Sequence, residues 1–361
     1  MSFKFRGGFC EMRNKIIFLL ILILLFSMVF SVSSSARIVT IVTDPLDSGT
    51  YGCTAGIARI INRYNTANLN IKVKPTTGST EIAGLLATGE GQLGVHNNFD
   101  AQLSWLTKGE EFQVYDQIMK VTPLRLLFGG AMTYFSTLVG GGRGIETGAD
   151  LKGKRYVGGF TAQPQDEASS EAFLNGWGLT REDVIWIEVA GVGDGIEGLL
   201  ENRVDAIGDT GPGGADMREL LAMRDVYFIS INTTPEGLKA FEDTYGYHAS
   251  IVTVNPNPLL PGVVRPTAML KTEDYYMARG DQISDEEAYA IVKSIWDHID
   301  EVRAIDPDLG TLSSPELLIT PGFTVPYHPG AIKFYTEKGI WSKDFADNQA
   351  VLLALEAEEM K

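Results

Sequence analysis

Residues 76–98, TTGSTEIAGLLATGEGQLGVHNN, contain one short helix and one strand between clusters of small polar residues. Ile82, Leu85 and Leu86 recur at the spacing of a single helix face. Gly89 can end this helix, because glycine readily adopts the left-handed conformation of a C-terminal cap. The QLGVHNN segment that follows predicts a strand that ends on two asparagines. A helix-to-strand unit of this kind is typical of α/β proteins.

The same alternation extends in both directions along the chain. RIVTIVTD and NIKVK predict two strands before this unit, with an apolar-faced helix between them. Residues 154–209 repeat the order strand, helix, strand, helix, strand. At an offset of 114 residues, positions 82–94 match positions 196–208 at five of thirteen residues. We therefore predict parallel sheets with right-handed crossovers, in two lobes of similar topology.

The N-terminal segment has the layout of a secretory signal. Basic residues precede an unbroken apolar run from Ile16 to Val32, and the small residues SSSA follow it. This pattern predicts a signal peptide over residues 1–36, with cleavage after Ala36 and a periplasmic or other extracytoplasmic destination. An uncleaved anchor helix remains the alternative, because seventeen apolar residues lie at the lower edge of what spans a bilayer.

The composition is that of a globular protein with an acidic surface. The 361 residues are 44% hydrophobic and 21% charged, and the formal net charge is −16 at pH 7. Two domains are therefore a reasonable expectation for the length. The acidic balance makes nucleic acid and anionic membrane surfaces unlikely partners.

Candidate catalytic and metal-binding residues do not form a complete set. His96 and Asp100 are four residues apart, but one histidine and one carboxylate are too few to hold a metal. Cys53 falls in an apolar-faced helix and would be the only cysteine left after signal cleavage, which favours packing and excludes an internal disulfide. His328 is best explained as a turn residue before Pro329. No paired carboxylates stand out, so we expect no metal, no cofactor and no enzymatic activity.

Several segments together resemble the TAXI-type solute receptors of tripartite ATP-independent periplasmic (TRAP) transporters. The segments are GTYGCTAGIARIIN, TTGSTEIAGLLATGEGQLGVHNN, LKGKRYVGG, WGLTREDV, RVDAIGD and YHPGAIKFYTEKGIW, in family order from about Arg37 to Trp341. The resemblance implies a type II periplasmic binding protein fold, with two α/β lobes, a hinge and an interlobe ligand cleft. It also implies a non-enzymatic receptor that delivers a small solute, commonly glutamate-like or dicarboxylate-like, to a sodium-coupled membrane permease.

The lobe boundaries follow from the position of the two expected linkers. Residues 132–139 and 263–270 combine strand-like cores with neighbouring glycine or proline. We predict that residues 37–133 and 266–361 form the first lobe and residues 134–265 the second. We expect a monomer, although the sequence does not determine the oligomeric state.

The first lobe is expected to contribute three loops to the cleft. In an open α/β sheet, ligands collect beyond the carboxyl ends of the strands, and helix N-termini there suit anionic groups. Asparagine side chains at the same edge both donate and accept hydrogen bonds. The predicted contacts are Thr50, Tyr51, Gly78, Ser79, Thr80, Asn97 and Asn98. Turn formation and helix capping are the alternative roles of these residue types.

The second lobe departs from the family pattern in one loop. Family members usually carry a Gly-Ser-Gly-Thr type loop after the strand KRYVGG, whereas this chain has FTAQPQDEAS. We predict that Asp166 caps the following helix, which places negative charge where a solute carboxylate would dock and favours an amine-bearing or neutral solute. Asp166 acting only as a cap is the alternative. The predicted contacts are Thr161, Gln163, Gln165, Asp166, Thr210 and Gly211, with Tyr134 from the hinge.

Two other functions remain open on the sequence alone. One is an enzyme built on the same bilobed fold, and the other is a sensory module that binds a solute and signals to a membrane partner. The absence of a convincing nucleophile or metal set argues against the enzyme.

Overall fold

A computed structural model describes residues 35–361 except 47, 107–121, 214, 247–248, 259, 307–308 and 313. The chain divides into a unit at Met1–Arg37 and a unit at Ile38–Lys361, and the second unit holds the fold described below. The predicted signal peptide lies outside the described residues, apart from its last two positions. In the described part of the chain, no helix has both the length and the hydropathy needed to cross a membrane.

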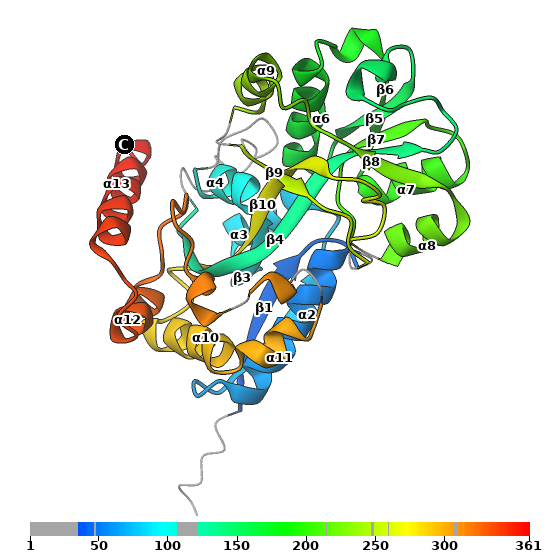
Figure 1. Ribbon diagram of the computed structural model, residues 1–361. Helices are drawn as coiled ribbons and strands as arrows, with labels where there is room; N and C mark the ends of the chain where they lie inside the picture. The colour runs from blue at the N-terminus through cyan, green and yellow to red at the C-terminus, as the bar shows by residue number, and fades with distance from the viewer. Residues whose placement is uncertain are drawn as a thin grey trace, which may run out of the picture. The chain divides into compact units, whose positions relative to one another are not determined.

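Helices and strands alternate along most of the chain (Figure 1). The strands are β1 (Arg37–Thr43), β2 (Leu69–Pro75), β3 (Leu93–Asn97), β4 (Leu124–Gly140), β5 (Arg155–Phe160), β6 (Ile185–Val189), β7 (Ala206–Thr210), β8 (Val226–Ile229), β9 (Ser250–Val254) and β10 (Thr267–Arg279). The helices are α2 (Gly49–Tyr64), α3 (Ser79–Thr88), α4 (Asn98–Leu106), α6 (Pro164–Gly176), α7 (Val192–Leu200), α8 (Ala215–Met223), α9 (Pro235–Tyr245), α10 (Asp285–Asp297), α11 (Ile299–Arg303), α12 (Pro329–Glu337) and α13 (Lys343–Glu359).

The strands join in the order β2-β1-β3-β10-β4-β7-β5-β6, with β9 on β10 and β8 on β4. The pairs β1–β3, β5–β6 and β5–β7 are parallel, as the alternating pattern predicts. The prediction of parallel sheets is wrong at the centre, where β10 runs antiparallel to both β3 and β4. β10 returns from a distant part of the sequence, so the local helix-strand alternation carries no information about its direction.

Two lobes share this sheet, each with its own hydrophobic core. The first lobe packs around β1–β3, the helices α2 and α10 and the C-terminal helices. The second lobe packs around β5–β8 with helices α6–α9, in two neighbouring clusters. β4 and β10 contribute to both: Phe128 is buried in the first lobe, whereas Leu138 is buried in the second. The predicted α/β fold with two lobes is confirmed.

The expected linkers are strands in the structure. Residues 132–139 lie within β4, and 267–270 form the start of β10. The two strands pair antiparallel, with Phe135 opposite Leu270 and Thr133 opposite Thr272. In Figure 1 they pass between the two lobes as the longest strands. The exact lobe boundaries, 133/134 and 265/266, remain a prediction.

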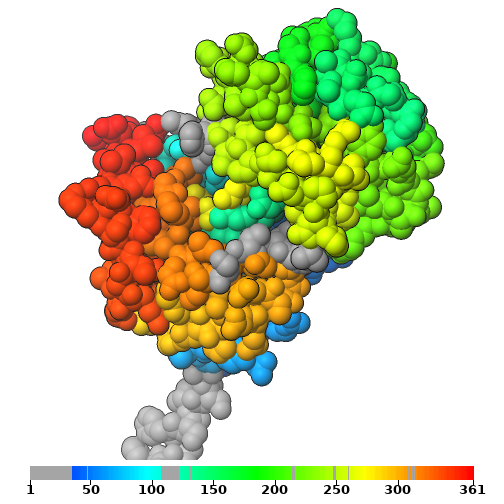
Figure 2. Space-filling view, viewed as in Figure 1, coloured from blue at the N-terminus to red at the C-terminus, as the bar shows by residue number. Residues whose placement is uncertain are grey.

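The C-terminal helix α13 lies on the flank of the first lobe (Figure 2). Glu356 of this helix is 9% exposed. Both carboxylate oxygens of Glu356 accept hydrogen bonds from Arg125 at 2.8 Å, and one also accepts from Trp105 Nε1 at 2.8 Å. Leu352 adds an apolar contact one turn earlier. A bidentate ion pair therefore holds the end of the chain to the start of β4.

Candidate functional site

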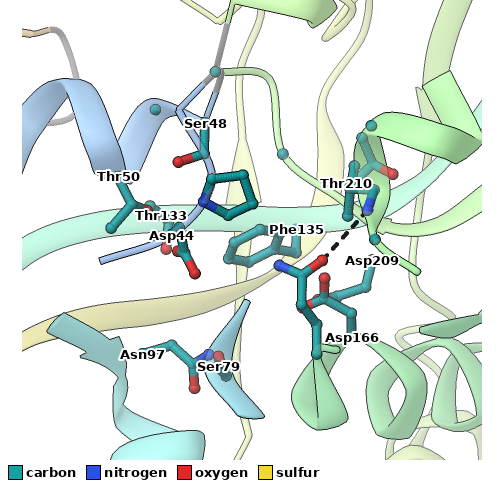
Figure 3. Close-up of a pocket in the computed structure, with 18 of the residues that line it drawn as sticks. Asp44, Ser48, Thr50, Ser79, Asn97, Thr133, Phe135, Asp166, Asp209 and Thr210 are labelled. Carbon is teal, nitrogen blue, oxygen red and sulfur yellow. Dashed lines mark hydrogen bonds between the residues drawn. The ribbon is translucent and has the colours of Figure 1, made fainter. Parts of the chain in front are cut away.

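A cavity of about 470 Å³ lies where the two lobes meet. The first lobe lines it with Asp44, Pro45, Ser48, Gly49, Thr50, Thr76, Thr77, Ser79 and Asn97. The second lobe lines it with Gln163, Gln165, Asp166, residues 190–194, Ile196, residues 209–213 and Asp216. Residues 133–135 of β4 and Asp274 of β10 complete the wall. In Figure 3 the residues of the two lobes face each other across this cavity, with Phe135 between them.

The first-lobe segments follow the carboxyl ends of three strands. β1 leads into Asp44 and Pro45, and Ser48 caps α2 by accepting a hydrogen bond from the Tyr51 amide at 3.0 Å. β2 leads into the turn before α3, and Thr76 anchors that turn by donating from its hydroxyl to the Thr43 carbonyl at 2.9 Å. The polar side chains that the sequence places at the strand ends therefore share one rim.

The second-lobe segments follow the same rule. β5 ends at Phe160 before α6, β6 ends at Val189 before α7, and β7 ends at Thr210 before α8. Gln163 links two of these turns, because its Oε1 accepts a hydrogen bond from the Val192 amide at 3.3 Å. Equivalent loops of both lobes therefore meet at one cavity.

Nine of the predicted site residues line the cavity. They are Thr50, Ser79, Asn97, Tyr134, Gln163, Gln165, Asp166, Thr210 and Gly211. Their role in binding remains a prediction, since the cavity shows position and not occupancy.

The five other predicted residues are absent from the cavity lining. Tyr51 lies in the first turn of α2, and Asn98 is the first residue of α4. Thr161 lies in the turn after β5 and is exposed. Gly78 and Thr80 lie at a direct contact between the lobes.

The lobe contact joins the N-terminus of α3 to the turn before α6. The Thr80 amide and the Thr80 hydroxyl both donate to the carbonyl of Ala162, at 3.2 and 3.3 Å. Gly78 has φ +149°, and a Cβ atom there would lie 2.6 Å from the same Ala162 carbonyl. Glycine at this position therefore allows the close approach of the two lobes.

Replacing Gly78 with alanine is expected to push the lobes apart at this contact. The added Cβ overlaps the Ala162 carbonyl, so the two Thr80 hydrogen bonds are lost, at a cost of about 1–3 kcal/mol. Small-angle X-ray scattering of the ligand-free protein should show a larger radius of gyration than for the wild type. Gly142→Ala is the matched control, because Gly142 also has a positive φ (+72°) but open space around its Cβ position. Identical scattering from all three proteins would contradict a role for this contact in holding the lobes together.

Asp166 is not the helix cap that the sequence predicts. The N-cap of α6 is Gln163, Pro164 follows in the first turn, and Asp166 lies further inside that turn. The cap prediction is wrong because proline, which is favoured at the first helical position, starts the helix earlier. The Asp166 side chain is 6% exposed and forms a side-chain hydrogen bond with Asp209.

Asp166 and Asp209 form a carboxyl pair that sequence analysis missed. Asp209 is the penultimate residue of the buried strand β7 and has a positive φ of 37°, and its Oδ2 accepts a hydrogen bond from Gln165 Nε2 at 2.6 Å. No sequence pattern made this pair stand out from the other acidic residues. Their separation of 43 residues conceals the pair in the sequence, although the position of Asp209 at a strand end indicates a place at the rim.

The electrostatics of the cavity favour protonated carboxyl groups when it holds no ligand. Burial raises the pKa of Asp209 to about 7. Burial, the charge of Asp209 and the more distant charges of Asp100 and Asp44 hold the pKa of Asp166 well above its usual range. Burial, together with the charge of Asp100, raises the pKa of Asp44 to about 7. Carboxylates from both lobes therefore repel one another across the cavity.

Asp44 and Asp274 are cavity residues that the sequence analysis did not name. Asp44 directly follows β1, so the strand-end rule that selects Thr50 also applies to it. Asp274 lies inside β10 and reaches the cavity because β10 pairs antiparallel with β3, opposite Asn97. No local pattern marks Asp274, since only the sheet order brings it there.

His96, His328 and Cys53 are buried in the fold. His96 is 2% exposed, lies 3.2 Å from the Ser104 hydroxyl, and burial lowers its pKa to about 3. His328 is the N-cap of α12, where its Nδ1 accepts from the Gly330 amide at 3.2 Å. Cys53 is 2% exposed within the core of the first lobe. Within the described part of the chain, no three of His, Cys, Asp and Glu are placed to hold a metal ion.

The fold and the cavity define a two-lobed α/β protein with a cavity at the strand ends of both lobes. The chain belongs to the NMT1-like family, whose model matches residues 43–339. No curated protein sequence matches the chain.

Solved structures similar to this chain have low sequence identity to it. A protein from Bordetella bronchiseptica RB50 has 19% identity and a TM-score of 0.46, over 88% of this chain and 89% of that chain. The periplasmic aliphatic sulphonate binding protein SsuA from Escherichia coli has 14% identity and a TM-score of 0.43, over 87% and 97%. A TRAP periplasmic solute binding protein from Chromohalobacter salexigens, with bound D-glucuronate, has 11% identity and a TM-score of 0.46, over 89% and 99%.

Proposed function

We propose that this protein is an extracytoplasmic solute-binding receptor of a TRAP transporter, of the TAXI type. It captures a small polar organic solute and delivers it to a sodium-coupled membrane permease. The observation that carries the proposal is the cavity of about 470 Å³, which is lined from both lobes by polar strand-end loops. The sequence resemblance to TAXI receptors covers both lobes and supports the transporter type.

The fold supplies a means of opening and closing this cavity. The lobes are connected through β4 and β10, which pair along Thr133–Phe135 beside the cavity. Rotation of the lobes about these strands opens the cavity to solvent, whereas the contact between Thr80 and Ala162 holds it closed. Closure removes the solute from water and presents a lobe arrangement that a permease can distinguish from the empty form.

The N-terminal segment fits the same role. We propose that residues 1–36 direct export and are cleaved after Ala36, so that the receptor works as a monomer outside the cytoplasm. Mass determination of the protein exported from an expression host tests this step, because an uncleaved anchor retains the whole segment.

Thermal unfolding of the full chain against a panel of solutes tests receptor function. The panel contains amino acids, dicarboxylates, keto acids, polyamines and neutral amides. A solute at one hundred times its Kd should stabilise the folded protein by about 2.7 kcal/mol and raise the midpoint by several degrees. Val192→Trp, which fills the cavity wall, should abolish that shift, whereas Val351→Trp on the exposed face of α13 should retain it. A flat response to every solute, with none bound to the purified protein, would count against the receptor.

An enzyme is the second candidate, because Asp166 and Asp209 are a buried carboxyl pair in a cavity. Such a pair can act as general acid and base when one member is protonated and the other ionised. Incubating each stabilising solute with the protein and analysing it by chromatography separates the two functions. Recovery of the unchanged solute agrees with a receptor, and conversion that Asp209→Asn abolishes indicates an enzyme.

A further inference from the structure

Every charged side chain that lines the cavity is acidic. Six aspartates contribute to the wall: Asp44, Asp166, Asp194, Asp209, Asp216 and Asp274. No lysine, arginine or histidine is among the described residues that line it. Asp166, Asp209 and Asp274 are 6%, 4% and 5% exposed, so water solvates their carboxyl groups poorly. The described wall of the cavity thus carries ionisable acidic groups and no cationic side chain.

The opposite end of the same strand shows how this chain neutralises a structural aspartate. Asp205 directly precedes β7, and its Oδ1 lies 2.7 Å from Arg155 Nη2 and 3.2 Å from Arg143 Nη1. Asp209, four residues later, receives hydrogen bonds from uncharged Gln165 and from the carboxyl group of Asp166. β7 therefore has a neutralised aspartate at its amino end and an aspartate without a cationic partner in the cavity wall at its carboxyl end.

Gln165 provides a second, independent observation that points to a ligand. Its side chain is fully buried and lines the cavity. Its Nε2 donates to Asp209, but its Oε1 has no hydrogen-bond partner among the described residues. A buried acceptor without a donor is costly, so a donor on the solute would stabilise this arrangement.

The missing partner must therefore donate hydrogen bonds and carry positive charge. An ammonium group has three donors, and Asp166, Asp209 and the Oε1 of Gln165 offer acceptors on one wall. A solute carboxylate has only acceptors, so it would repel the aspartates and leave Gln165 unsatisfied. Tyr134 and Phe135 line the cavity from β4, and aromatic rings attract a cation that lies over their faces.

A bare metal ion fits the wall less well than an organic cation. The described residues contain no group of three metal-binding side chains placed around one point. A cavity of about 470 Å³ has room for a small organic molecule.

We propose that the cavity binds an organic cation, a compound with a protonated amine or guanidinium group, and that this group lies between Asp44 of the first lobe and the Asp166–Asp209 pair of the second. Figure 3 shows Asp44 and Asp166 on opposite sides of the cavity. The inference rests on the proposed function, because it takes this cavity to be the solute site. It names a solute class opposite in charge to the glutamate-like and dicarboxylate-like compounds that the family resemblance suggests.

Isothermal titration calorimetry of the full chain tests the charge of the solute. The probes are putrescine, spermidine, agmatine, arginine, glutamate, succinate, glucose and calcium chloride, each at 150 mM sodium chloride. We expect at least one of the four amine or guanidine compounds to bind with one-to-one stoichiometry. Asp166→Asn and Asp44→Asn should each weaken that binding about thirtyfold or more, because each removes one partner of a desolvated charge pair. Asp243→Asn, on the exposed face of α9, should leave it unchanged.

Each other outcome overturns the inference in a distinguishable way. Binding of glutamate, succinate or glucose without binding of any organic cation would contradict the cation inference and would still support receptor function. Binding of calcium alone replaces the organic cation with a metal ion. Cation binding that the cavity variants retain places it on the acidic outer surface, outside this cavity. If no probe binds and the thermal panel is also flat, the proposed function fails together with the inference.

Discussion

Replacing Asp209 with asparagine is expected to make the ligand-free protein more stable at pH 8, and to remove much of its dependence on pH. Burial raises the pKa of Asp209 to about 7 in the folded protein, whereas an unfolded aspartate titrates near 3.9. The folded state therefore binds the proton more tightly than the unfolded state. The contribution of protonated Asp209 to stability is present in full below about pH 4 and is lost as the pH rises towards 7.

The expected size of the change in the free energy of unfolding follows from the shift in the pKa of Asp209. Three pKa units correspond to about 4 kcal/mol, at 1.36 kcal/mol for each unit. Asp44 shifts in the same direction and by a similar amount, so the wild type should lose several kcal/mol between pH 4 and pH 8. The groups that act on Asp209 are Asp166, Asp100, Gln165 and Ser169. Of these, only Asp166 and Asp100 carry charge, and both are acidic.

Asparagine is well suited to this position. It preserves the size of the side chain and can still accept the hydrogen bond from Gln165. It can also donate to Asp166, which replaces a repulsion at pH 8 with a hydrogen bond. The backbone of Asp209 has φ +37°, and asparagine tolerates a left-handed conformation better than most residues.

Urea denaturation at pH 5 and pH 8 measures this effect, because urea adds no ionic strength. The free energy of unfolding of the wild type should fall between the two pH values. That of Asp209→Asn should fall by about 3 kcal/mol less, because about two pKa units separate pH 5 from the folded pKa of about 7. Asp243→Asn is the control, since that aspartate is exposed and pairs with Lys239 on the surface of α9. Equal pH dependence in the wild type and Asp209→Asn would show that Asp209 is ionised in the folded state.

Replacing Glu356 with alanine is expected to destabilise the first lobe by about 3–5 kcal/mol, the cost of leaving one half of a buried ion pair without its partner. Arg125, whose side chain is 17% exposed, would lose both of its hydrogen bonds to the carboxylate, and Trp105 would lose its acceptor. Trp105 is itself fully buried, so its indole N–H would have no water to replace Glu356. The expected result is a lower free energy of unfolding, with α13 detaching first.

Chemical denaturation gives the change in stability, and hydrogen exchange over α13 shows whether the helix detaches. Glu358→Ala removes an exposed glutamate from the same helix and should change neither measurement by more than about 0.5 kcal/mol. Glu356→Gln should recover part of the loss, because an amide oxygen can still accept from Trp105. Equal stability of Glu356→Ala and Glu358→Ala would mean that the apolar contacts of Leu352 and the hydrogen bonds of Asn348 and Gln349 hold α13 without the ion pair.

Much of the candidate site can be found from strand ends alone. Thr50 and Ser79 reach the cavity because they follow the carboxyl ends of β1 and β2, and Asn97 and Thr210 reach it because they end β3 and β7. Sequence periodicity locates such strands reliably, and topology then brings their carboxyl ends to one rim. Thr80 shows the limit of this rule. It directly follows Ser79, which lines the cavity, but its own side chain contacts the other lobe.

The amino-acid sequence by itself determined the α/β alternation, the two-lobed organisation and the loops that face the cavity, because these depend on local periodicity and turn chemistry. Only the tertiary structure decided the direction of β10, which places Asp274 opposite Asn97. It also decided the pairing of Asp166 with Asp209 and of Glu356 with Arg125, across 43 and 231 residues of chain. Such contacts depend on how separate elements pack, and a local pattern holds no information about which distant side chain completes a charge or a hydrogen bond.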